Sequence, residues 1–421
     1  MRKILLTFVL LIIFSSVVNA AEKNFETEEI RLSCALSSLA AYSDNEGYLA
    51  RQILISRGWT VYNLTDKKNS VYVKAYLIGK KFSDDKSVKI LVITGTEDIK
   101  NVEVNFRLGG VTFHKDVSDG IFVHRGFRDY ADAALSGGVS DYIINELNSN
   151  PNETLYVTGH SLGGSVAMVT AARLCDMGVD KNRMKVITFG ALAVGNKAMA
   201  KFYEDKLDLT RIEVKGDVVR KLFEPFGYVQ FGDEVKYKPV KDVEQYEHKM
   251  TLYFDCAIRN YFDAGGFDFP EIVSENKIDT PIYVAPLKFL VETVTPKNEK
   301  YVHALIKNGL TARFKNIHFA EQNYLDVESV DDISSGVVRT IEEAKKVGCK
   351  YVLLQLLSAE RVRDATDETR QVVFYEYLYK SDGTPIFMQT SGMTTKKVTL
   401  LGATIFVQEN LRTELEDAVK E

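Results

Sequence analysis

Apolar residues along the first two thirds of the chain follow two alternating patterns. Short continuous apolar runs, such as 89–93 and 155–157, are typical of strands that are buried on both faces. Before and between these runs lie longer segments, such as 28–41, in which apolar residues recur at helical spacing. Buried strands that alternate with helices predict a mostly parallel sheet with right-handed crossovers. This part of the chain is therefore predicted to be an α/β domain.

The same pattern sets the boundaries of the individual elements. The polar segment 66–69 predicts a turn that joins strands over 59–64 and 70–79 into an antiparallel hairpin at the sheet edge. One long helix is expected over 129–147, before the turn-rich residues 148–152. The other predicted elements are a helix over 28–41, strands over 89–93, 155–157, 184–189 and 210–214, and a long helix that ends at 177.

A segment rich in Gly, Pro and polar residues interrupts the periodicity near 265. We predict a first domain over 21–265, a linker over 266–280 and a smaller α+β domain over 281–421. The elements expected in the second domain are strands over 281–287, 313–319 and 350–357, helices over 299–310 and 337–347, a strand pair over 370–380 and 385–390, and a final helix over 404–419.

The first twenty residues have the pattern of a secretory signal peptide. Arg2 and Lys3 precede an apolar run over 4–14, and the small residue Ala20 offers a cleavage position. The alternative, a transmembrane anchor, is disfavoured because the apolar run is short and no basic stop-transfer cluster follows it. The sequence thus predicts an exported protein, either periplasmic or secreted.

Composition and charge describe an ordinary globular protein of 421 residues, of which 45% are hydrophobic and 26% charged. The formal net charge of -5 argues against a nucleic-acid partner. The widely spaced cysteines form no metal or redox motif, and both disulfide pairing and buried free thiols are open for them. They are Cys34, Cys175, Cys256 and Cys349.

The segment 155–172 carries the main chemical signal of the chain. It reads as a strand, then Gly159-His160-Ser161-Leu162-Gly163, then a helix, which is the context of a nucleophile elbow. In an elbow the serine hydroxyl lies exposed on a tight turn, and the glycines let strand and helix pack closely. The alternative is a Gly-rich helix start in which Ser161 is an ordinary polar residue.

A nucleophilic serine needs an imidazole base and a carboxylate that orients it. Only three of the six histidines follow Ser161, and His303 and His318 fall in the second domain, which leaves His248 as the candidate base. Asp217 lies in the loop after the strand 210–214, where parallel sheets deliver catalytic groups, and it is the preferred acid. Asp233 and Glu234 are its rivals, whereas Asp205 and Asp208 are expected on the solvated surface.

Two donors are expected to bind the oxyanion that forms during acyl transfer. The backbone N–H of Leu162, at the start of the helix, supplies one. The loop Gly95-Thr96 after the central strand is expected to supply the second, with the hydroxyl of Thr96 as an additional donor. The alternative for this loop is a plain turn at the end of a strand.

Over residues 28–262 the chain resembles the class 3 lipase family, the fungal-lipase-like branch of the α/β-hydrolases. Its matching segments are 91–96, the His-x-Gly-Phe segment 123–127, the elbow 158–164, the segments 187–190, 194–196 and 216–219 that lead to the acid, and Glu247-His248 with Tyr253. The resemblance implies an α/β-hydrolase fold, Ser161 as nucleophile, Asp217 as acid and His248 as base. It also implies that Thr96 and Leu162 form the oxyanion hole.

The chain departs from the family pattern at two loops. Ile93 and Thr94 stand where the family usually has an aromatic residue and an arginine, and Leu192 stands where it usually has a proline. Residues 97–120 occupy the place of the family's lid. The second domain weakly resembles the small α+β domains of bacterial envelope proteins, so an envelope or other protein partner is expected for it, with an inert appendage as the alternative.

Two functions are weighed from the sequence. The preferred one is an exported serine hydrolase that cleaves carboxylic esters of lipids, namely triacylglycerol, phospholipid or shorter acyl esters, without metal or organic cofactor. The alternative is a catalytically inactive envelope scaffold that carries a lipase-like domain. The complete set of Ser161, Asp217 and His248 argues against loss of activity.

Overall fold

The computed structural model describes residues 24–68, 71–95, 109–114, 119–239, 248–265, 277–290, 296–322, 324–325, 334–362, 369–395 and 398–420. Contacts among them separate two compact units. The first contains the described residues up to 239 together with 248–257, and the second contains those from 258 onward. The predicted signal peptide 1–20 and most of the predicted linker 266–280 lie outside the described residues.

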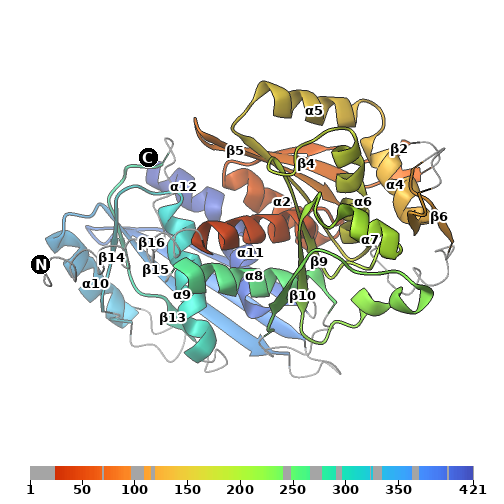
Figure 1. The fold of residues 1–421 in the computed structure, drawn as a ribbon. Coiled ribbons are helices and arrows are strands. Elements are labelled where there is room, and N and C mark those ends of the chain that lie inside the picture. Colours follow the sequence, from red (N-terminus) through yellow and green to blue (C-terminus); the bar gives the residue numbers. More distant parts are fainter. Residues whose placement is uncertain are drawn as a thin grey trace, which may run out of the picture. The chain divides into compact units, whose positions relative to one another are not determined.

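The first unit is built on a seven-stranded sheet with the order β1-β4-β5-β8-β9-β10-β11. The strands β5, β8, β9, β10 and β11 run parallel, whereas β1 and β4 add antiparallel at one edge (Figure 1). This is the mostly parallel sheet that the apolar runs predict. Its strands are β1 (Thr60–Asn63), β4 (Ala75–Ser83), β5 (Lys86–Ile93), β8 (Glu153–His160), β9 (Met184–Phe189), β10 (Asp208–Val214) and β11 (Asp233–Tyr237).

Helices cover the sheet because its central strands are apolar on both faces. Side chains of α4, α5, α6 and α7 share one apolar core with alternate residues of the strands, such as Leu91 and Val157. On the other face, helical residues 24–40 approach the sheet, and Ser38 Oγ lies 3.3 Å from Thr158 Oγ1. The helices of this unit are α2 (Asn45–Ser56), α4 (Arg125–Leu135), α5 (Val139–Ser149), α6 (Leu162–Asp176), α7 (Lys197–Tyr203) and α8 (Met250–Gly265), of which α8 continues into the second unit.

Some elements of the first unit differ from the predicted ones. The expected turn 66–69 is wrong, because β2 (Asp66–Lys68) pairs with β3 (Val71–Val73) in a small separate sheet. The single helix expected over 129–147 is two helices, α4 and α5, because Gly138 between them has a φ of 85° that ends the helical path. Other short elements are β6 (Gly110–Thr112), β7 (Phe122–His124), η2 (Val219–Lys221) and η3 (Glu224–Phe226).

The second unit is a six-stranded mixed sheet with the order β14-β12-β15-β16-β17, in which β13 also pairs with β15. The helix α10 shares an apolar core with one face through residues such as Ile341 and Leu354. The helix expected over 404–419 is again two helices, α11 and α12. The elements of this unit are β12 (Ile282–Val284), β13 (Lys288–Phe289), α9 (Pro296–Thr311), β14 (Ile317–Phe319), α10 (Ser334–Lys346), β15 (Tyr351–Arg361), β16 (Arg370–Lys380), β17 (Pro385–Thr395), α11 (Leu400–Asn410) and α12 (Arg412–Lys420).

None of the four cysteines forms a disulfide bond, so of the two alternatives left open for them the structure has the thiol form. Within the described residues, no helix has the length and apolar character needed to cross a bilayer. The same residues contain no group of three or more His, Cys, Asp or Glu side chains placed to hold a metal ion.

The contact between α6 and the end of β5 fixes the central part of the first unit. A Cβ atom built on Gly163 would lie 2.3 Å from the carbonyl oxygen of Ile93 and 2.8 Å from the backbone nitrogen of Gly95. One built on Gly159 would lie 2.5 Å from the backbone of Gly163. Real Cβ atoms do not approach backbone this closely, so glycine at both positions is what allows strand and helix to pack at this distance.

We expect Gly163→Ala to destabilise the protein by about 2 kcal/mol or more, because backbone must move to admit the new methyl group. Gly109→Ala is the matched control, since its Cβ meets no atom within 4 Å and its φ is not left-handed. Thermal and urea unfolding of both variants check the prediction. Equal stability of the two variants would contradict the packing described here.

Candidate active site

Ser161 lies in the turn between the last residue of β8 and the first residue of α6. Its φ of 58° and ψ of −127° make it the one non-glycine residue with a positive φ among those that the structure describes. Such a conformation is strained for an L-residue and persists only where the surrounding structure holds it. The serine is 3% exposed. The geometry is that of the strained elbow predicted from the sequence.

His248 lies against Ser161 although 87 positions separate them in the sequence. Its Nε2 is 2.8 Å from Ser161 Oγ, and its Nδ1 is 2.7 Å from Asp217 Oδ2. An ionised carboxylate only accepts hydrogen bonds, so Nδ1 carries the proton and Nε2 accepts from the serine hydroxyl. The structure therefore brings together the three residues that the sequence singles out, in the order that a base and its orienting acid require.

The carboxylate of Asp217 receives two further hydrogen bonds. The backbone N–H of Val219 donates to Oδ1 at 2.9 Å, and the hydroxyl of Tyr253 donates to Oδ2 at 2.6 Å. Tyr253 in turn accepts from the N–H of Val214 at 3.2 Å, and burial raises the pKa of its phenol well above the usual value. These donors provide hydrogen-bond partners for a carboxylate that is only 5% exposed.

Tyr253 also belongs to the site, but the sequence alone does not predict its hydrogen bond with Asp217. The sequence shows it only as part of the segment that follows His248. It lies in the first turns of α8, five positions after His248, and this places its hydroxyl beside the acid. A tyrosine at such a short distance after a candidate base is the signal that could have identified it.

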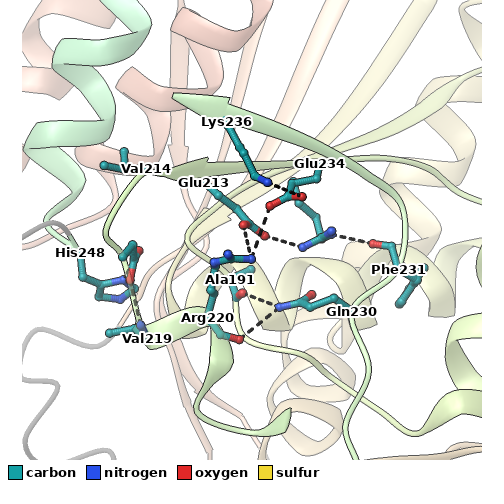
Figure 2. A network of polar contacts seen from close by, with 12 residues as sticks. Ala191, Glu213, Val214, Val219, Arg220, Gln230, Phe231, Glu234, Lys236 and His248 are labelled. Atoms are coloured by element: carbon teal, nitrogen blue, oxygen red, sulfur yellow. Dashed lines mark hydrogen bonds and ion pairs between the residues drawn. The ribbon is translucent and has the colours of Figure 1, made fainter. Parts of the chain in front are cut away.

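The rival carboxylates lie on β11 and face other partners. Glu234 forms ion pairs with Arg220 at 3.5 Å and Lys236 at 3.3 Å, and Asp233 is exposed. Figure 2 shows the guanidinium of Arg220 between Glu234 and Glu213. Burial raises the pKa of Glu213, which is 3% exposed. Neither rival is a hydrogen-bond partner of His248 in the contacts that the structure describes, whereas Asp217 is.

The same polar network anchors the segment that follows Asp217. Glu213 on β10 binds Arg220, whose carbonyl oxygen accepts from Gln230 Nε2 at 3.4 Å. Gln230 Nε2 also donates to the carbonyl oxygen of Ala191, after β9, at 3.0 Å (Figure 2). The loop that carries the acid is thus tied to the ends of two neighbouring strands.

The two residues expected in the oxyanion hole are described to different extents. Leu162 is the first residue of α6, so its N–H belongs to the first helical turn, where N–H groups have no acceptor within the helix. Thr96 lies outside the described residues, which resume after 95 only at 109. The lid expected over 97–120 falls largely on the same undescribed segment and on 115–118.

Comparison with known proteins covers the elbow and the acid. Residues 90–226 match the family model of the class 3 lipases. This stretch is similar to the class 3 lipases. The match includes Ser161 and Asp217 and ends before His248.

Individual relatives match shorter parts of the chain. A protein named secreted mono- and diacylglycerol lipase 1 from Fusarium solani is 31% identical over 144 residues, which are 32% of this chain and 41% of that protein. Lipase ZK262.3 from Caenorhabditis elegans is 40% identical over 73 residues, or 17% and 21% of the two chains. The chain thus spans less than half the length of these curated relatives. The solved triacylglyceride lipase of Rhizomucor miehei aligns with a TM-score of 0.41 and 21% identity, over 51% of this chain and 80% of that one.

Two residues at which the chain departs from the class 3 lipase pattern, Leu192 and Thr94, make hydrogen bonds in the structure. The N–H of Leu192 donates to Ser165 Oγ at 2.9 Å, a bond that a proline at this position could not make. The hydroxyl of Thr94 donates to the carbonyl oxygen of Ala41 at 3.0 Å. Both loops are therefore held by contacts that depend on the residues found here.

His124, from the lipase His-x-Gly-Phe segment, is packed among aromatic rings. Its ring is stacked on Phe223 with centroids 5.2 Å apart, and the Phe127 ring lies 4.4 Å away. The imidazole is fully buried, and burial lowers its pKa to about 4. A histidine that resists protonation in the folded state but not in the unfolded state makes stability depend on pH.

We expect the free energy of unfolding to fall as the pH drops from about 6.5 toward 4. Over that range the unfolded chain binds a proton at His124 that the folded chain does not bind, so acidification favours unfolding. Replacing His124 by Phe should remove about 1.4 kcal/mol per pH unit from this slope. Urea unfolding of the two proteins between pH 7 and 4.5 measures the difference, and parallel slopes would refute it.

Proposed function

We propose that this chain is an exported serine hydrolase that cleaves carboxylic ester bonds of lipids, with Ser161 as nucleophile, His248 as base and Asp217 as acid. The observation that carries the proposal is the pair of hydrogen bonds from Ser161 Oγ through His248 to Asp217, at 2.8 and 2.7 Å. The class 3 lipase match around Ser161 and Asp217 supports it. The strained φ of Ser161 supports it as well.

The reaction begins when Ser161 Oγ attacks the carbonyl carbon of the ester and His248 Nε2 takes the hydroxyl proton. The imidazolium that forms is stabilised by the Asp217 carboxylate through Nδ1–H. The proton then passes to the departing alkoxide, which leaves as the alcohol, and an acyl-enzyme remains. Water, deprotonated by His248, attacks this ester and releases the carboxylic acid and free Ser161.

The tetrahedral oxyanion is assigned to the backbone N–H of Leu162 and to Thr96. Two such donors stabilise the transition state by several kcal/mol, because they point to where charge develops and need no reorganisation. The start of α6 directly after Ser161 supports the role of Leu162. The role of Thr96 rests on its place after the central strand β5.

A lipid substrate fits the surface that follows the acid. Val218, Phe226 and Val229 belong to the segment after Asp217 and are 67%, 57% and 38% exposed. These exposed apolar side chains follow the acid closely in the sequence and support an apolar substrate. The name of the Fusarium solani relative, a mono- and diacylglycerol lipase, adds support for glycerol esters. Triacylglycerol, phospholipid and shorter acyl esters are the candidate substrates.

Export is part of the proposal. It rests on the signal-peptide pattern of residues 1–20 and agrees with the word "secreted" in the name of the same relative. The second unit is assigned a docking role toward an envelope or other protein partner. Its sheet ends, in the described part of the chain, at β17, an eleven-residue strand without a charged side chain, and such an edge suits addition of a partner strand.

We expect the purified chain to hydrolyse p-nitrophenyl esters and Ser161→Ala to lose at least about 10⁴-fold of that activity. Esters of graded acyl length measured on both proteins give the preferred chain length. A fluorophosphonate probe should label the unmutated chain and not the variant, because it reacts with an activated serine. A chain that turns over no ester and takes up no probe would favour the inactive scaffold instead.

The acid is tested separately. We expect Asp217→Asn to lower kcat by about 10³- to 10⁴-fold, because an amide cannot hold His248 in the tautomer with its proton on Nδ1. Asp233→Asn is the matched control, since this exposed carboxylate lies on β11. Steady-state kinetics on the same ester compare the two, and a comparable loss in both variants would remove Asp217 from its assigned role.

A further inference from the structure

A second chain of hydrogen bonds lies behind the base. His160, the residue before Ser161, places its Nε2 2.7 Å from the carbonyl oxygen of His248. Its Nδ1 lies 2.6 Å from the hydroxyl of Tyr42. The rings of His160 and His248 have centroids 4.8 Å apart, and the side chains of His160 and Tyr42 are buried. The main-chain carbonyl of His248 is thus held by His160, the residue next to Ser161.

The position of each proton in this series of hydrogen bonds follows from the groups that the His160 ring contacts. A carbonyl oxygen only accepts, so His160 Nε2 carries a proton and donates it to His248. A neutral imidazole has one N–H, so Nδ1 accepts from the hydroxyl of Tyr42. Burial, and then the neighbouring His248, lower the pKa of His160 well below its usual value, so the neutral ring is retained.

Tyr42 is itself fixed by the loop after β5 and by its own backbone. A Cβ built on Gly95 would lie 2.4 Å from the Tyr42 hydroxyl oxygen and 2.5 Å from the carbonyl oxygen of His160. Arg51 Nη1 donates to the carbonyl oxygen of Tyr42 at 2.8 Å. One hydroxyl therefore contacts both the loop assigned to the oxyanion hole and the histidine that holds the base.

We propose that Tyr42 and His160 are positioning residues that hold the main-chain carbonyl of His248, and with it the imidazole, at Ser161 Oγ during proton transfer. The proposal rests on the function proposed above. Asp217 fixes the imidazole from its Nδ1 side, and the Tyr42–His160 pair fixes the backbone from which the imidazole extends. Neither residue of the pair is a hydrogen-bond partner of Ser161 Oγ in the contacts described, and His160 keeps its proton throughout.

Loss of the Tyr42 hydroxyl should act on turnover more than on substrate binding. Without that donor, the proton of His160 can move to Nδ1, and the Nε2 lone pair then faces the carbonyl oxygen of His248 and repels it. A misplaced general base lowers the rate of the chemical step, and small displacements of a catalytic group have large effects. We expect Tyr42→Phe to lower kcat about tenfold and to change KM by less than about twofold.

The experiment compares four variants of the full chain on one short ester. Tyr42→Phe removes only the hydroxyl, His160→Leu removes the donor to His248, and His160→Gln keeps an N–H that can donate to the same carbonyl. Tyr237→Phe is the control, since its buried hydroxyl contacts Glu28 of the helical segment 24–40. We expect kcat to fall in Tyr42→Phe and His160→Leu, to be largely retained in His160→Gln, and to be unchanged in Tyr237→Phe.

Two readouts separate positioning from plain stability. The pH profile of kcat/KM should differ between Tyr42→Phe and the unmutated chain, because a displaced imidazolium is less well held by Asp217. Thermal unfolding of each variant shows whether it is folded at the assay temperature. Wild-type kcat and pH profile in Tyr42→Phe, or equal losses in Tyr42→Phe and Tyr237→Phe, would overturn the proposal.

Nitrogen and proton NMR of the histidine rings tests the pair without relying on turnover. The expected spectrum has His160 neutral with its proton on Nε2, and a downfield Nδ1 proton on His248 that shifts or broadens in Tyr42→Phe. If the unmutated chain is inactive but this resonance responds, the positioning stands and the proposed hydrolase fails. If the chain is active and the resonance does not respond, the hydrolase stands and the positioning fails.

Discussion

The close approach of β5, β8 and α6 is the constraint on which the candidate site depends. A Cβ atom on Gly163 would meet the carbonyl oxygen of Ile93 at 2.3 Å, so the start of α6 lies directly against the end of β5. Ser161 occupies the turn between β8 and α6 and takes a strained φ of 58°. This conformation needs rigid neighbours on both sides, and the strand and the helix provide them. The hydroxyl direction is therefore a consequence of backbone packing.

Burial around the serine dictates which side chains can be charged there. Asp217 is buried but receives hydrogen bonds from Val219, Tyr253 and His248, and these offset the loss of water. His160, equally buried, has a carbonyl oxygen and a phenol as partners and stays neutral. A second positive ring beside His248 would oppose the imidazolium of the proposed acyl transfer. A neutral His160 avoids this repulsion while still supplying a donor.

Local pattern and chain order were enough to predict the sheet and the residues that meet at Ser161. The strand 184–189 agrees with β9 because all of its residues except Lys185 are buried, as in a strand covered on both faces. His248 followed from elimination, since the chain has few histidines. The split of 129–147 into α4 and α5 was missed because helical periodicity continues on both sides of Gly138. The contact of Tyr42 with His160 was missed because it joins residues 118 positions apart, and no local pattern records such a pairing.

All residues of the candidate site lie in the first unit, and none lies in the second. Ser161, Asp217 and His248 all belong to the first unit, and so do the side chains of Tyr253 and His160 that bind them. The second unit has its own sheet and its own apolar core. Every hydrogen bond described around Asp217 and His248 comes from the first unit. The groups proposed for acyl transfer thus lie in the first unit, and the docking role proposed for the second unit is a separate question from that chemistry.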